Sequence, residues 1–465
     1  MTAPAPDPEL LPGTRRALSH RLAVGQADGR TPSLVGGVVR SGQVVWTDGR
    51  SMIEGHAPDG QVQYRIGSIT KSFIAVLVLR LRDQGRLSLG DTLEQHLPGT
   101  TAGTVTIHQL LSHTSGLAAE TPEPWWERTP GSLRPHLADV LNDEPFRHPS
   151  GRRFHYSNTG FALLGALVEE VHGQPWADVL RREVLEPLGM TRTTTLPQAP
   201  HAGGFAVHPW ADVMLPEPLT DTGLMAPAGQ LWSTGADLCR WAAFLAAGDE
   251  RVLRAASIEE MRRPAGEPDG ARWTSAYGLG LQLRREGDRV LYGHGGSMPG
   301  FLASVWVSQD DDACAVVLTN TTSGTPVSDL AADLIRIVAE HEPPFPTPWR
   351  PLSDVDPQLL ALTGPWYWGP AALVLRLNAD RGLELAPVGA GRGSSFRAEP
   401  DGTWTGLDGY YAGERLRVVR ADDGTVSHLD IGSFVVTRAP YDPAAPIPGG
   451  VDPDGWPTTA RRSES

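Results

Sequence analysis

The chain has 465 residues, a length at which a single hydrophobic core usually gives way to more than one domain. Hydrophobic residues make up 40% and charged residues 20% of the chain, which is typical of a globular protein and excludes a disordered or membrane-embedded one. The formal net charge of -14 repels phosphate backbones and anionic lipid surfaces, so we expect neither nucleic acid nor a membrane as a partner.

The first segment, residues 1–7, lacks the basic and apolar regions of a secretory signal. No run of about 18 apolar residues follows it, so the sequence predicts no membrane span. We therefore expect a cytoplasmic protein. Residues 34–47 then form two β-branched-rich runs around Ser41-Gly42-Gln43, a pattern that predicts a β-hairpin.

A mostly helical block follows this hairpin. Residues 68–84 predict an amphipathic helix, and Thr106 with Gln109 three residues later has the spacing of a capping box at the start of a second helix. Three further segments carry apolar residues at helical spacing: 159–171, 177–184 and 236–247.

Three strand-like runs and a last helix close this part of the chain. The strands are expected at 289–292, 301–307 and 313–319, and the helix at 327–340. With the first hairpin these runs can pair into one antiparallel sheet. We therefore predict an α/β (α+β) fold for residues 1–342, an antiparallel five-stranded sheet flanked by helices with an inserted all-helical lobe.

The remainder of the chain changes in composition. Residues 343–357 are proline-rich and predict a linker, and residues 358–440 carry short alternating runs that predict a small all-β domain, barrel-like or a sandwich. Residues 441–465 are rich in Pro, Gly and Asp and are expected to be a disordered tail. The six predicted strands are 373–377, 383–386, 403–405, 416–419, 425–429 and 434–437.

One residue stands out by its rarity, because Lys71 is the only lysine among 40 basic residues. Arginine stays protonated in proteins, whereas a desolvated lysine can accept a proton. Lys71 follows Ser68 by one helical turn on the same face, so the two side chains can meet. The backbone N–H of Ser68, unpaired in the first turn, would supply half of an oxyanion hole. Taken alone, the motif also fits an N-cap serine followed by a solvated lysine.

A second candidate segment is Phe154-His155-Tyr156-Ser157-Asn158, directly before the helix predicted at 159. A tyrosine beside a lysine can relay protons between a nucleophile and a leaving group, and an asparagine amide can hold a substrate carbonyl. A purely structural role remains open, in which Ser157 or Asn158 caps the helix and Tyr156 packs against it.

The third candidate segment is glycine-rich and spans residues 293–301 on a strand edge. Glycines such as Gly296 let a substrate backbone approach closely, and we expect the N–H of Ser297 to be the second oxyanion donor. His294 lies in the same segment. The alternative is an ordinary glycine-rich turn that contains a hydrogen-bonded histidine.

Taken in this order, the three segments resemble the active-site motifs of the β-lactamase and penicillin-binding-protein superfamily. Tyr156-x-Asn158 is similar to the second motif of the class C β-lactamase branch, and His294 stands where that branch has lysine, as in its esterase-like members. Residues 110–117 and 227–234 also resemble family segments. The resemblance covers residues 32–340, and the C-terminal part resembles the lipocalin-like domain appended to some members.

The resemblance implies a mechanism through a covalent acyl-enzyme. It makes Ser68 the nucleophile, Lys71 its base and Tyr156 the proton shuttle, with Asn158 and His294 as substrate-orienting groups. A third-motif lysine helps to bind the carboxylate of β-lactams, and a neutral imidazole at position 294 would do so poorly.

We expect neither a metal nor a cofactor. The histidines lack the spacing of a zinc site with a paired Cys or Glu, and the chain has no phosphate-binding glycine loop. Cys239 and Cys314 each lie in an apolar stretch and are expected to be buried thiols.

The function expected from the sequence is that of a serine hydrolase acting on small esters, amides or short peptides, as an esterase or a D-amino-acid-type peptidase. A small molecule or a peptide is therefore the expected partner. Three alternatives remain open: a penicillin-binding-protein-type thioesterase or peptide cyclase, a β-lactamase, and a non-catalytic binding protein on the same fold.

Overall fold

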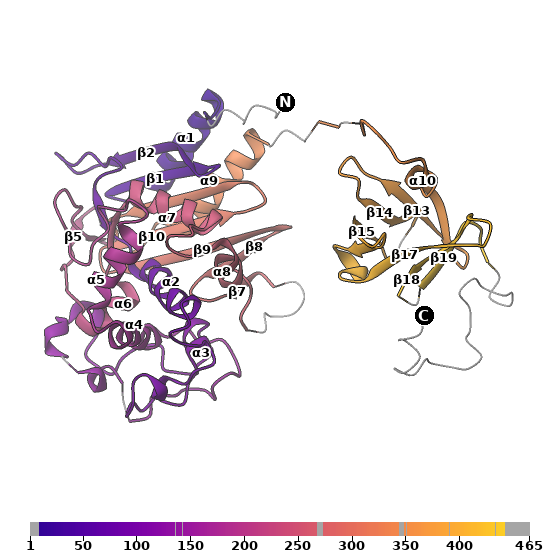
Figure 1. The fold of residues 1–465 in the computed structure, drawn as a ribbon. Helices are drawn as coiled ribbons and strands as arrows, with labels where there is room; N and C mark the ends of the chain where they lie inside the picture. Colours follow the sequence, from indigo (N-terminus) through magenta and orange to yellow (C-terminus); the bar gives the residue numbers. More distant parts are fainter. Residues whose placement is uncertain are drawn as a thin grey trace. The chain divides into compact units, whose positions relative to one another are not determined.

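The computed structural model describes residues 9–134, 136–141, 143–266, 273–343, 348–349, 351–389, 391–432 and 434–441. Internal contacts divide the chain into two units, Met1–Pro344 and Phe345–Ser465, each treated by itself below (Figure 1). Apart from Tyr441, the tail expected at 441–465 lies outside the described residues, as do residues 344–347 and 350 of the expected linker.

The first unit is built on an antiparallel sheet of seven strands in the order β2-β1-β11-β10-β9-β8-β7. Both the predicted hairpin and the three later strands are present. The prediction of five strands was two too few, because the edge strand β7 and its neighbour β8 are short and bury few side chains. The strands are β1 Ser33–Arg40, β2 Gln43–Ser51, β7 Ser275–Tyr277, β8 Gln282–Glu286, β9 Arg289–Met298, β10 Phe301–Ser308 and β11 Ala313–Thr319.

Helices cover both faces of this sheet. Strand β11 shows the two layers. Val317 points into a core cluster shared with α1 (Pro12–Asp28) and α9 (Val327–His341). Val316 points into the larger cluster shared with α2 (Thr70–Asp83) and α7 (Gly235–Ala247). Alternate side chains of a strand face opposite sides, so every residue of β11 is buried. This central strand holds the layers together.

A helical lobe adjoins the face that carries α2. The predicted helices are present in this unit, with small shifts at their ends, and Thr106 and Gln109 form the expected capping box at the start of α3. The segment predicted at 177–184 is a short α-helix that continues as a π-helical turn, Arg181–Leu185. The helices are α2 Thr70–Asp83, α3 Ile107–Leu111, α4 Asn158–His172, α5 Trp176–Leu180, α6 Ala226–Gly229, α7 Gly235–Ala247 and α8 Ala255–Met261.

Two small ribbons complete the first unit. Strand β3 (Gln63–Arg65) pairs with β6 (Trp232–Thr234), and β4 (Phe205–Val207) pairs with β5 (Met214–Pro216). The β3–β6 pair places the start of α2 beside α6, because β3 leads into α2 and β6 follows α6 along the chain.

The second unit is a closed barrel, which decides between the barrel and the sandwich that the sequence left open. Side chains fill its interior, among them Trp366, Phe396 and Leu416, each at most 1% exposed. Its likeness to lipocalins stays a prediction. After the short helix α10 (Pro357–Leu360), the strands are β12 Gly364–Trp368, β13 Ala371–Leu377, β14 Leu383–Pro387, β15 Ser394–Ala398, β16 Trp404–Gly406, β17 Arg415–Arg420, β18 Val426–Ile431 and β19 Phe434–Thr437.

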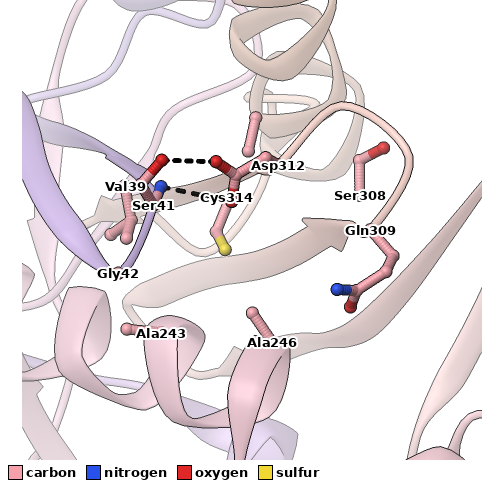
Figure 2. Close-up of a pocket in the computed structure, with 10 residues that line it drawn as sticks. Val39, Ser41, Gly42, Ala243, Ala246, Ser308, Gln309, Asp312 and Cys314 are labelled. Carbon is pink, nitrogen blue, oxygen red and sulfur yellow. Dashed lines mark hydrogen bonds between the residues drawn. The ribbon is translucent and has the colours of Figure 1, made fainter. Parts of the chain in front are cut away.

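A small cavity lies between the β1–β2 turn, the β10–β11 turn and α7. Figure 2 shows Cys314 and Gln309 on its wall, with Ser41 hydrogen-bonded to Asp312 across its rim. Its volume of about 20 Å³ leaves room for roughly one water molecule, so it holds no substrate. Cys314 and Cys239 are both buried and both free, as expected.

No helix within the described ranges combines the length and the apolar character that crossing a membrane requires.

Candidate active site

Ser68 lies in a 3-10 turn, Gly67–Ile69, that leads into α2. The α-helix therefore begins two residues later than the predicted 68–84 segment. Residues 67 and 69 are buried, whereas Ser68 is partly exposed, so solvent reaches this serine but not its neighbours. Gly67 has a φ of 52°, a conformation that favours glycine and turns the chain sharply before the serine.

Lys71 lies beneath Ser68 in the interior of the unit. Its Nζ donates hydrogen bonds to Ser68 Oγ at 3.0 Å, to Asn158 Oδ1 at 2.7 Å and to the carbonyl of Ala228 at 2.6 Å. The side chain is 0% exposed, and burial lowers the pKa of Lys71 to about 7, against the opposing charges of Glu120 and Glu127. In the neutral amine two N–H donors remain for Asn158 and Ala228, and the lone pair can accept a proton from the Ser68 hydroxyl.

Tyr156 flanks the same pair from the segment before α4. Lys71 Nζ lies 4.9 Å from the centroid of its ring. Burial raises the pKa of Tyr156, and a hydrogen bond with the Ser68 side chain partly opposes that rise. The phenol is therefore protonated at neutral pH and in contact with the serine hydroxyl.

Asn158 is the first residue of α4, and both ends of its amide bond protein groups. Its Oδ1 accepts from Lys71, and its Nδ2 donates to Glu120 Oε1 at 2.8 Å. The other oxygen of Glu120 accepts from Trp126 Nε1 at 2.7 Å. The helix cap is Ser157, whose Oγ accepts from the Gly160 N–H, so capping accounts for Ser157 but not for Asn158.

Strand β9 packs its glycine-rich end against the turn that carries Ser68. A Cβ on Gly67 would lie 2.5 Å from the Ser297 nitrogen, and a Cβ on Gly296 would lie 3.1 Å from the Ser68 nitrogen. The N–H of Gly295 donates to the side chain of Gln282 on β8. Because N–H groups alternate in direction along a strand, the N–H of Ser297 faces the same side, beyond the point where the β8 pairing ends.

His294 is buried, and both of its ring nitrogens have protein partners. Nδ1 donates to the Gly295 carbonyl at 2.5 Å, so Nε2 accepts from the Tyr277 hydroxyl at 3.0 Å. Burial, with the charge of Lys71, lowers the pKa of His294 to about 3. The imidazole is therefore neutral, and its ring lies 6.4 Å from that of Tyr156.

The structure thus brings together all three segments singled out in the sequence. It also adds groups that sequence reasoning missed, namely Gly67, Glu120 and Tyr277. The glycine directly before the serine was a usable signal, because a glycine there permits the left-handed turn. Nothing in the local sequence marks Glu120 or Tyr277, because only the tertiary fold brings them to the site.

No three His, Cys, Asp or Glu side chains in the described part of the chain are grouped as a metal site would require.

The sheet with its helical lobe, and a partly exposed serine bonded to a buried lysine, is the architecture of the β-lactamase and penicillin-binding-protein class. Residues 15–340 match the family model described as Beta-lactamase, and residues 355–438 match a domain of unknown function. Because the first match covers well over half of the chain, this protein belongs to the Beta-lactamase family.

Curated relatives agree with this assignment. The chain is 32% identical over 298 residues to penicillin-binding protein 4 of Amycolatopsis lactamdurans, which covers 59% of this chain and 75% of that protein. It is 28% identical over 276 residues to protein flp of Staphylococcus aureus strain COL, covering 56% of this chain and 53% of that protein. The chain thus spans only about half the length of the staphylococcal protein.

Solved structures show the same fold. The octameric penicillin-binding protein homologue from Pyrococcus abyssi aligns with a TM-score of 0.62 at 21% identity, over 91% of this chain and 99% of its own. A D-stereospecific amidohydrolase from Streptomyces sp. aligns with a TM-score of 0.56 at 25% identity, over 71% of this chain and 99% of its own. The D-amino acid amidase of Ochrobactrum anthropi SV3 aligns with a TM-score of 0.60 at 23% identity, over 70% of this chain and 98% of its own.

Proposed function

We propose that this protein is a serine hydrolase that forms an acyl-enzyme on Ser68. The observation that carries the proposal is the hydrogen bond of 3.0 Å between Lys71 Nζ and Ser68 Oγ. The amine is desolvated and has a pKa near 7, whereas the serine remains partly exposed to an incoming substrate. A general base with a pKa near the working pH removes a proton most effectively.

In the acylation step, Lys71 accepts the proton of the Ser68 hydroxyl as Oγ attacks the substrate carbonyl. The C–O bond to the serine forms, and the carbonyl electron pair moves to the oxygen of a tetrahedral intermediate. When this intermediate collapses, the bond to the leaving amine or alcohol breaks, and the proton held by Lys71 passes to the leaving group through Tyr156. Water then attacks the ester on Ser68 as Lys71 accepts one of its protons. The acid is released, and the proton on Lys71 returns to Ser68 Oγ.

The backbone N–H groups of Ser68 and Ser297 are the proposed oxyanion hole. The close approach of β9 at Gly296 and Ser297 to the turn around Gly67 supports this assignment. Backbone donors held in this way stabilise charge that develops on the substrate oxygen, and they need no reorganisation during the reaction.

Tyr156 is the proposed proton shuttle to the leaving group, because its phenol is protonated and in contact with Ser68. For Asn158 we propose a double role. Its Oδ1 holds Lys71 in place, and the amide borders the space that a substrate carbonyl would occupy. His294 has no nitrogen directed at the substrate, so we propose that it orients the end of β9 through its contact with Gly295.

The proposed substrates are small esters and amides with a free amino group, including D-amino acid amides. Glu120 is exposed at the site, and its charge together with that of Glu127 acts on Lys71. With Lys71 neutral, these carboxylates favour a cationic substrate. The similarity to a D-amino acid amidase and a D-stereospecific amidohydrolase supports the same class.

The same charges disfavour β-lactams, which carry a carboxylate. The neutral, buried His294 replaces the lysine that would bind such a group, and Glu120 would repel it. We therefore expect β-lactamase activity to be weak in comparison with hydrolysis of amino acid amides.

Intact-mass analysis with a fluorophosphonate probe tests this proposal directly. We expect a single adduct on the wild type, none on Ser68→Ala, and a much slower reaction on Lys71→Arg, because a guanidinium does not act as a base. A folded wild type that forms no adduct would rule out the enzyme and favour a non-catalytic binding protein.

Water is the acceptor in this proposal, and an amine is the alternative acceptor, as in a thioesterase or peptide cyclase. Incubation with an acylated pantetheine thioester of a short peptide separates the two. A linear acid as the sole product supports hydrolysis, whereas a cyclic peptide would show transfer to an amine.

A further inference from the structure

His113 is a buried histidine that lies directly against Tyr156. Its side chain is 0% exposed, and its ring centroid lies 4.2 Å from that of Tyr156. The rings of Tyr277 and Phe161 lie 4.6 and 5.1 Å away. The residue belongs to the 110–117 segment, for which the mechanism proposed above gives no role.

The hydrogen bonds of His113 bracket Tyr156 on both sides. The N–H of His155 donates to the His113 carbonyl at 2.7 Å, and the N–H of Ser157 donates to His113 Nδ1 at 3.0 Å. The two chain neighbours of Tyr156 are therefore both bonded to one residue. These two bonds fix the backbone on either side of Tyr156, and the Tyr156 ring packs against the His113 imidazole.

The protonation of this imidazole follows from its contacts. Because Nδ1 accepts a hydrogen bond, the proton of the neutral ring is on Nε2. Within the described residues, Nε2 is buried without a hydrogen-bond partner. Burial, with the charge of nearby Lys71, holds the pKa of His113 well below its ordinary value. The ring is therefore neutral.

Two local features of His113 are unfavourable by themselves. A buried N–H without a partner is costly, and a φ of 55° is uncommon for a residue other than glycine. Such costs persist where the surrounding structure enforces them, and they are concentrated at functional sites. At His113 both occur in the residue that brackets Tyr156.

We propose that His113 is a positioning residue that holds the Tyr156 hydroxyl in line between Ser68 and the leaving group. The inference rests on the proposed function, because it assigns the residue a part in delivery of the leaving-group proton. It predicts that loss of the His113 contacts slows reactions in which the leaving group must be protonated and spares those in which it need not be.

The test compares the methyl and p-nitrophenyl esters of one acyl group, such as a D-amino acid with a free amino group. Methoxide leaves only with a proton, whereas p-nitrophenolate leaves without one, so only the first ester depends on Tyr156. His113→Phe keeps an aromatic ring but loses the acceptor for the Ser157 N–H. His113→Asn keeps an acceptor and tolerates the positive φ but loses the ring.

For His113→Phe we expect kcat on the methyl ester to fall at least 10-fold with little change in KM, and kcat on the p-nitrophenyl ester to fall less than 3-fold. Tyr156→Phe should show the same dependence on the leaving group, and the double variant should lose no more than Tyr156→Phe alone. His113→Asn should fall between the wild type and His113→Phe. As a control, His172→Phe, in the last turn of helix α4 and away from Ser68, should leave both rates unchanged.

Melting temperatures identify a variant that fails to fold, and His113→Asn then decides the question. Equal losses on both esters, or no loss on either, would overturn the positioning role. A wild type that cleaves only the p-nitrophenyl ester would overturn it as well, because no proton delivery would then be present. A wild type that neither cleaves an ester nor forms the fluorophosphonate adduct would instead overturn the proposed function itself.

Discussion

Lys71 Nζ lies 3.0 Å from Ser68 Oγ, and the lysine is 0% exposed while the serine is partly open to solvent. In the proposed mechanism, this arrangement separates the two requirements of a serine nucleophile. The proposed base is kept out of water, which lowers the pKa of Lys71 to about 7, and the hydroxyl stays accessible to solvent. Variants that alter the surroundings of Lys71 should shift its pKa, and the pH dependence of activity measures that shift.

The activity should follow the neutral form of Lys71. Because burial lowers the pKa of Lys71 to about 7, kcat/KM should rise with pH through about 7 and level off above it. The charge of Glu120 raises this pKa, so Glu120→Gln should shift the acidic limb to lower pH while keeping an acceptor for Asn158. A profile measured between pH 5 and about 9 checks both statements. An unshifted limb in Glu120→Gln would show that the limb belongs to another group.

Asn158→Asp should shift the same limb in the opposite direction. The new carboxylate would lie within hydrogen-bonding distance of Lys71 Nζ and stabilise its charged form, so the pKa of Lys71 should rise. At pH 7 we expect kcat/KM to fall about 10-fold or more, with recovery as the pH increases. Asn158→Ala is the control, because it removes the hydrogen bond without adding charge. A loss in Asn158→Asp that does not vary with pH would contradict the electrostatic argument.

Gly67→Ala should damage the oxyanion hole. The residue has a φ of 52°, and its Cβ would lie 2.5 Å from the Ser297 nitrogen, so β9 must move away from Ser68. We expect kcat to fall about 100-fold, the loss typical of one missing oxyanion donor. Gly85→Ala is the matched control, since its φ is 71° but a Cβ there would meet nothing within 4 Å. In both variants the free energy of unfolding should fall by about 1 to 2 kcal/mol, because alanine disfavours the left-handed backbone conformation. Only Gly67→Ala should also lose activity.

Truncation tests which part of the chain the chemistry needs. The Glu342 carboxylate accepts from the Leu11 N–H at 2.8 Å and from the Thr14 hydroxyl at 2.7 Å, and its carbonyl accepts from Arg40 at 2.7 Å. We expect a chain ending after Pro343 to keep fluorophosphonate labelling of Ser68. A chain ending after Glu340 should be less stable by about 1 to 3 kcal/mol, because the buried Thr14 hydroxyl loses its partner. Urea unfolding compares the two chains, and equal stabilities would contradict this account of Glu342.

Much of the fold was accessible from sequence pattern. Helical periodicity identified α2, α4, α7 and α9, and alternating or continuous apolar runs identified the central strands. Strand β7, at the sheet edge, and its neighbour β8 were missed because both are short and bury few side chains. In the barrel, β12 and β15 were missed in the same way, since each is short and carries polar or partly exposed residues.

The sequence by itself determined which candidate residues the site contains. The single lysine three residues after Ser68, the Tyr-x-Asn spacing and the glycine-rich segment are local patterns, and local patterns are visible without a fold. They predicted that Ser68 and Lys71 would meet, because one helical turn places residues three apart on the same face.

Only the tertiary structure decided how these groups are held. Glu120 reaches Asn158 across 38 residues of chain, and Tyr277 bonds His294 from a different strand. The lowered pKa of Lys71 arises from burial, among contacts to Ser68, Asn158 and Ala228 that lie far apart in the sequence. Burial likewise lowers the pKa of His294 and keeps its ring neutral. Burial and long-range contacts are properties of the packed molecule, so no local pattern in the sequence encodes them.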